Sequence, residues 1–150
     1  MAVVVTRAAA GLRAGSIRRR SVPVGAATGN PLQVTKVDFI GIPSTDFDRS
    51  MAFYVDTLGL RRDEHSKTEF WVGAQCYGFW KPEWMNEEIQ PSQTTLALHV
   101  EDVPAARAEL EAKGVEFAGD FDSGVCHMAF FKDPDGNHLM LHNRYKAYEQ

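Results

Sequence analysis

Residues 37–60 read VDFIGIPSTDFDRSMAFYVDTLGL, and residues 95–117 read TLALHVEDVPAARAELEAKGVEF. Both stretches run from an apolar strand pattern through an Asp to a helix pattern of about three turns, then through a Gly to more apolar residues. Asp46 of the first stretch matches Asp102 of the second. Two half-chains that share this order indicate an internal repeat.

The matched residues have physical roles that support the repeat. Asp46 and Asp102 suit helix N-caps, because a carboxylate oxygen can accept a free backbone N–H of the first turn. Gly59 and Gly114 suit the position after the last helical turn, where a positive φ favours Gly. The first helix has an apolar stripe of Met51, Phe53, Tyr54 and Leu58.

Short stretches typical of strands follow each Gly. They are residues 69–73 and 76–80 in the first half, and residues 115–118, 125–132 and 138–142 in the second. Asp133-Pro134-Asp135-Gly136-Asn137 predicts a turn before the last strand, and Asp133 and Asp135 are expected to be turn residues rather than catalysts. The sequence therefore predicts an α+β fold in which each half is β-α followed by about three strands, with residues 81–94 as a linker.

The charges are unevenly placed along the chain. All 20 acidic residues lie at or after Asp38, whereas residues 1–36 hold six of the 16 basic ones, so these parts carry +6 and 10 − 20 = −10. Residues 1–33 are rich in Ala, Gly, Arg and Ser, a composition typical of a disordered extension or of an organelle transit peptide. The folded domain is expected over residues 34–145.

Composition also excludes some classes of function. An acidic body disfavours nucleic acid, whose binding needs many Lys and Arg contacts to phosphate. No apolar run approaches the about 18 residues that span a bilayer. Two cysteines are too few for a disulfide framework and suggest a reducing compartment. The expected location is the cytoplasm, or a mitochondrion or plastid if residues 1–33 are a transit peptide.

Three segments carry a resemblance to a known family: FIGIPSTDFDRSMAFYVDTLGL (39–60), LALHVEDVPAARAEL (96–110) and FFKDPDGNHLMLH (130–142). With them the sequence resembles the vicinal oxygen chelate superfamily, also called the glyoxalase/bleomycin-resistance/dioxygenase family. The resemblance covers about residues 36–145. It implies two βαβββ modules, about 36–81 and 95–142, that form a cupped mixed sheet around a pocket. It also implies a homodimer.

The resemblance further implies where a divalent metal would be held. Metal-using relatives have ligands at the positions of Phe39, Thr95 and Met140, and a fourth among residues 77–80. Phe, Thr and Met are poor ligands for a hard cation, so no metal and no cofactor are expected. One alternative stays open, because His99, His138 and His142 share a strand face with these positions, and three imidazoles suit zinc, copper or nickel.

Without the metal ligands, the implied pocket becomes apolar, as small-molecule sites commonly are. The predicted ligand-binding residues are Phe39, Trp71, Trp80, Thr95, Cys126, Met128, Phe130 and Met140. An aromatic block of Trp71, Tyr77, Phe79, Trp80 and Trp84 either stacks a flat ligand or belongs to the core. Cys126 precedes His127, but adjacent strand residues face opposite ways, which favours an inert thiol. Glu69 and Glu101 are expected to be solvated charges at strand edges.

Two function hypotheses follow. In the first, the protein binds a small aromatic or amphipathic molecule without chemistry. In the second, it is a lyase, an isomerase or a dioxygenase-type enzyme of the family that uses a displaced metal or its histidines. His99, His138 and His142 are then the candidate catalytic acids and bases, because imidazole titrates near neutral pH.

Overall fold

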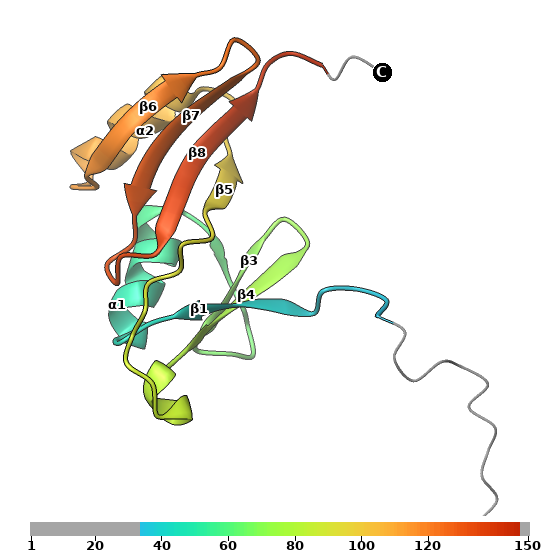
Figure 1. Cartoon of the computed structure of the whole chain (residues 1–150), viewed down its shortest axis with the longest axis vertical. Helices are drawn as coiled ribbons and strands as arrows, with labels where there is room; N and C mark the ends of the chain where they lie inside the picture. Colours follow the sequence, from blue (N-terminus) through green and yellow to red (C-terminus); the bar gives the residue numbers. More distant parts are fainter. Residues whose placement is uncertain (1–33, 148–150) are drawn as a thin grey trace, which may run out of the picture. The chain divides into compact units, whose positions relative to one another are not determined.

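The computed structural model describes residues 34–147, which form two βαβββ modules in succession (Figure 1). The predicted basic extension over residues 1–33 lies outside the described residues. The α+β class and the duplicated module, both predicted from the sequence, are confirmed. No helix among residues 34–147 is long and apolar enough to cross a membrane.

The first module forms a four-stranded sheet in the order β1-β4-β3-β2. Its elements are β1 (Phe39–Pro43), α1 (Phe47–Met51), the π-helix η1 (Ala52–Thr57), β2 (Arg61–Arg62), β3 (Glu69–Val72) and β4 (Gln75–Trp80). Strand β1 runs parallel to β4, and the other pairs are antiparallel. Strand β2 was not among the predicted stretches, because two arginines carry no alternating apolar pattern.

The second module repeats this order as β5-β8-β7-β6. Its elements are β5 (Leu96–His99), α2 (Val103–Ala112), β6 (Phe117–Asp122), β7 (Cys126–Lys132) and β8 (His138–Arg144). Strand β5 is parallel to β8. The linker between the modules contains one short 3-10 helix, η2 (Pro82–Met85). The predicted turn at residues 133–137 joins β7 to β8.

Both predicted helix N-caps are confirmed. The backbone N–H of Arg49 donates to the Asp46 carboxylate at 3.1 Å, and that of Ala105 donates to the Asp102 carboxylate at 2.9 Å. The first helix differs from the prediction in its second half, where Leu58 N–H donates to the Phe53 carbonyl five residues back. Such π turns are rare and often occur at functional sites.

The core combines both modules. The Tyr54 ring stacks on Phe70 with centroids 4.7 Å apart, and both rings are fully buried. Buried side chains of the second module complete the core, namely Leu98, Val103, Leu110, Val115, Ala129, Phe131, Leu139 and Leu141.

Polar contacts from the β7–β8 turn also join the modules. Asp133 accepts a hydrogen bond from Tyr54, and the Asn137 side-chain amide donates to the Pro43 carbonyl at 3.0 Å. Asp135 forms an ion pair with Arg49 at 2.6 Å. The prediction that the two aspartates are turn residues is confirmed, because the Asp133 carboxylate accepts the backbone N–H groups of Asp135 and Asn137 within the turn. Both aspartates also hold side chains of the first module, which was not predicted.

Candidate functional site

Each sheet turns one face toward the core and leaves the other face open. Tyr77 and Phe79 of β4 are buried in the core, so the residues that alternate with them lie on the opposite side. We call the side of each sheet that faces away from the core the open face. In the first module it carries Phe39, Glu69, Trp71, Cys76 and Trp80; in the second it carries Ala97, His99, Met128, Phe130, Met140 and His142.

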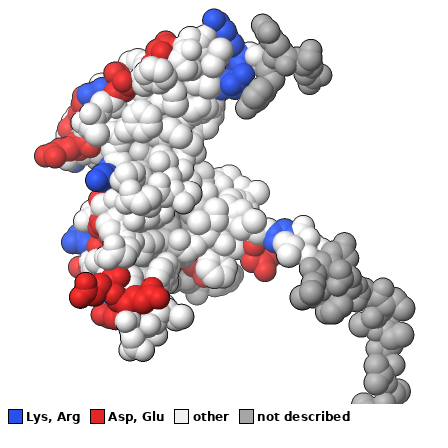
Figure 2. Space-filling model, viewed as in Figure 1, with Lys and Arg blue, Asp and Glu red and all other residues white. Residues whose placement is uncertain are grey.

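Bulky side chains cover two glycines on the open face of the first module. A Cβ on Gly41 would lie only 3.1 Å from the Trp80 ring, and one on Gly78 would lie 3.4 Å from the Glu69 Cγ. Phe39 is 62% exposed. Glu69 is half-buried rather than fully solvated, because it packs over Gly78 from the interior strand β3. In Figure 2 the β3–β4 hairpin is almost free of charged side chains.

The second module places its predicted residues in two cross-strand rows. One row is Phe130, Met140 and Ala97, and the other is Met128, His142 and His99. Phe130 is 37% exposed and Met128 and Met140 are half-buried. The alternation that the sequence predicted for these strands therefore places sulfur and aromatic groups together on one accessible face.

The three histidines do not converge. His99 and His142 are register partners, but His138 lies four residues from His142 on one strand, about 13 Å away at about 3.3 Å a residue. The His99 side chain is 64% exposed and lies 3.3 Å from Glu101. One ion cannot reach all three imidazoles, so the three-histidine metal site is wrong.

The positions that the family resemblance assigns to metal ligands do not fit a divalent cation either. Phe39 offers no donor atom, Thr95 offers one hydroxyl, and Met140 offers a soft thioether. No group of three His, Cys, Asp or Glu side chains over residues 34–147 is placed to hold a metal ion. The chemistry of this open face is that of an apolar surface with a few polar groups.

The predicted aromatic block divides between two faces. Tyr77 and Phe79 belong to the core, whereas Trp71 and Trp80 lie on the open face. Trp84 lies in η2, is 63% exposed, and contacts Phe47 edge-on at 5.8 Å. A single stacking platform of all five rings is therefore wrong, because side chains alternate along β4.

Both cysteines are free and buried on the open-face side of their strands. Burial, and then the charge of Glu69, raises the pKa of the Cys76 thiol. Cys126 accepts a hydrogen bond from the Arg144 guanidinium at 3.6 Å. His127 aligns with Asp122 and Asn143 on the other face, so it cannot activate Cys126. The prediction that the two side chains face opposite ways is confirmed.

A cavity of about 190 Å³ lies where β1 meets the start of the second module. Thr95 and His138, both predicted site residues, line it together with Ile40, Tyr54 and Tyr77. Ile40 was not predicted, because nothing in its local sequence distinguishes it from a core residue, and Tyr77 was predicted only as a member of the aromatic block. The cavity depends on which strands become neighbours across modules, which only the tertiary structure shows.

Two βαβββ modules, each with a four-stranded sheet that has an apolar open face, define the class of protein, a duplicated α+β domain. The family model named Glyoxalase/Bleomycin resistance protein/Dioxygenase superfamily matches residues 36–141. The chain belongs to this superfamily.

Individual relatives are more distant. A protein of Vibrio parahaemolyticus named as a probable lactoylglutathione lyase is 28% identical over 115 residues, which is 64% of this chain and 81% of that protein. The crystal structure of TnmS3, an antibiotic binding protein from Streptomyces sp. CB03234, has 25% identity and a TM-score of 0.60, covering 74% of this chain and 97% of that one. A lactoylglutathione lyase structure from Agrobacterium tumefaciens, 17% identical with a TM-score of 0.59, covers 73% and 94% and shares the fold.

Proposed function

We propose that this protein binds a small aromatic or amphipathic molecule on its open face, without the metal that the superfamily commonly uses. The proposal rests on the side chains at the three positions where the family resemblance implies metal ligands. Where the resemblance implies ligands, this chain has Phe39, Thr95 and Met140, and their neighbours on the open face are Trp71, Trp80 and Phe130. Likeness to an antibiotic binding protein supports it.

The test is a titration of protein that has been treated with a chelator. The probe is 1-anilinonaphthalene-8-sulfonate, a flat amphipathic dye, followed by its fluorescence. Phe130→Ala and Phe39→Ala should each weaken binding about three- to tenfold, the loss expected for one aromatic contact. Trp84→Ala is the matched control, since Trp84 is exposed but lies in η2. Equal affinity in all variants, or a probe recovered chemically changed, would contradict the proposal.

A second candidate function is a lyase or isomerase of the same superfamily. It is supported by the register pairing of His99 with His142 on the open face and by the Vibrio relative's name. The assay uses S-lactoylglutathione, the compound in that name. His99→Ala and His142→Ala should each abolish turnover and leave binding intact, while His138→Ala, farther along β8, tests the third predicted residue. Turnover that survives all three substitutions would remove this candidate.

A homodimer belongs to the proposal as well. Exposed apolar side chains are costly to leave in water at about 25 cal/mol per Å². Phe39, Phe121 and Phe130 are exposed on the open face of the single chain, and a second copy over the sheets would bury them and complete the cup. Light scattering should give twice the chain mass, and Phe121→Glu should shift it toward the monomer. A monomeric wild type would contradict this part.

A further inference from the structure

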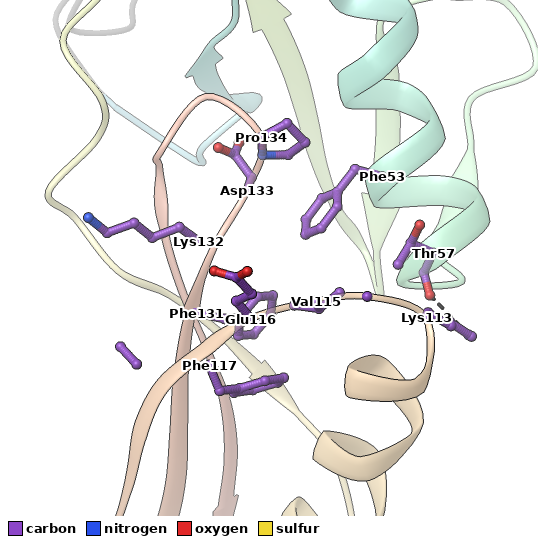
Figure 3. A pocket seen from close by; sticks show the side chains of 12 residues that line it. Phe53, Thr57, Lys113, Val115, Glu116, Phe117, Phe131, Lys132, Asp133 and Pro134 are labelled. Carbon is purple, nitrogen blue, oxygen red and sulfur yellow. Dashed lines mark hydrogen bonds between the residues drawn. The ribbon is translucent and has the colours of Figure 1, made fainter.

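We propose that a groove on the helix side of the sheets binds a small amine with an aromatic or otherwise apolar body. The groove has a volume of about 510 Å³, within the range of ligand pockets of about 300–1,000 Å³. We call it the η1–β6 groove, because η1 forms one wall and the chain from α2 into β6 forms the other (Figure 3). None of the predicted site residues lines it.

Apolar side chains form the body of this groove. Phe53 projects from η1 into it, and Val115 and Phe131 lie across from it in the second module (Figure 3). Phe131 is buried, and Phe53 is half-buried and thus accessible to a ligand. Phe53 and Thr57, four residues apart in η1, line the same wall, and π turns occur frequently at functional sites.

The charged side chains of the groove favour a ligand with a positive charge. The Glu116 carboxylate makes no hydrogen bond or ion pair with residues 34–147, and Figure 3 shows it on the side of its chain that faces Phe53. Asp133, a second carboxylate on the wall, is held by Tyr54. An ammonium group beside Glu116 gains an ion pair with its carboxylate.

The two lysines of the groove do not compete for this place. The Lys113 ammonium donates to the Thr57 carbonyl at 3.1 Å and pairs with Glu109 at 2.8 Å. Lys132 extends away from Phe53 and Glu116 in Figure 3. A cationic head at Glu116 with an apolar body toward Phe53 and Phe131 therefore matches the groove better than an anion does.

The experiment titrates 2-phenylethylamine into the ¹⁵N-labelled full chain and follows backbone amide resonances. Shifts are expected at residues 53–57 and 114–118, and weaker ones for 3-phenylpropionate, which has the same ring and the opposite charge. Glu116→Gln should weaken amine binding about two- to fivefold, the range for an exposed charge pair. Glu88→Gln, at an exposed linker position without a polar contact over residues 34–147, should leave it unchanged.

Three results would overturn the proposal. The first is the absence of shifts in the groove at millimolar amine, or shifts confined to the open face around Phe39 and Met140. The second is equal amine affinity in Glu116→Gln, whose preserved spectrum would show that it is folded. The third is binding of 3-phenylpropionate at least as tight as that of the amine, which would assign the groove to Lys132 and an anion.

Discussion

The Tyr54 hydroxyl donates a buried hydrogen bond of 2.9 Å to the Asp133 carboxylate, joining the helix of the first module to the β7–β8 turn of the second. The same carboxylate accepts bonds from the Asn137 amide and from the backbone N–H groups of Asp135 and Asn137. Burial, and then the charge of Asp133, raises the pKa of Tyr54, so the hydroxyl stays protonated and donates at any physiological pH.

Replacing Tyr54 by Phe should therefore lower the free energy of unfolding by about 1–2 kcal/mol, since a bond to a charged acceptor is lost while Asp133 keeps other donors. Urea denaturation of the wild type and the variant measures this change in the free energy of unfolding. Tyr77→Phe is the matched control, because Tyr77 is also buried in the first module but its hydroxyl has no partner among residues 34–147. An equal loss in both variants would mean that the bond contributes nothing specific.

Acid should weaken the contact between the modules through Asp135. Although burial raises the pKa of this carboxyl, hydrogen bonds from Thr45 and the charge of Arg49 outweigh it and hold the pKa below its usual range. A carboxyl with a lowered folded-state pKa adds stability above the unfolded pKa of about 3.9, and this is lost as the pH falls through the folded value.

Asp135→Asn should then cost about 1–3 kcal/mol at neutral pH, because the side chain is only 3% exposed and its charged partners stay behind. The difference from wild type should shrink below about pH 4. Denaturation at a series of pH values measures this, with Asp56→Asn, at an exposed η1 position, as control. A difference that does not change with pH would contradict the assignment.

Two glycines of the open face should respond differently to Ala. Gly41→Ala forces the Trp80 ring to move from a Cβ at 3.1 Å, which should cost about 1–3 kcal/mol and weaken binding of the open-face dye. Gly78→Ala meets an ordinary contact of 3.4 Å and should be neutral or stabilising by about 0.5–1 kcal/mol, since Gly weakens a strand. Equal effects of the two would show that Trp80 does not lie over Gly41.

The cysteines should behave as inert thiols. Cys76 and Cys126 are buried, and burial raises the pKa of Cys76, so its reactive thiolate is scarce near neutral pH. Reaction with Ellman's reagent should be slow in the native protein and fast for both thiols in denaturant. Cys76→Ser should remove one of the two released equivalents. Rapid native reaction of Cys126 would indicate that Arg144 activates it.

Local sequence was sufficient for the repeat and its elements. Three features depend only on residues a few positions away: the aspartate caps, the glycines after each helix, and the period-two pattern of β7 and β8. They can therefore be predicted from the sequence. The same alternation correctly placed Phe130, Met128 and Met140 on one face. The π turn of η1 could not be predicted from the sequence, because the apolar spacing of Met51, Tyr54 and Leu58 fits an ordinary α-helix equally well.

The sequence by itself thus determined a duplicated βαβββ domain and an open face without metal ligands at the family's positions. Only the tertiary structure decided that Asp133 and Asp135 hold the first module, that His99 pairs with His142, and that Glu116 and Phe53 share a groove. These relations join residues distant in sequence, and their geometry is set by how strands pair and how the modules pack, which no local pattern specifies.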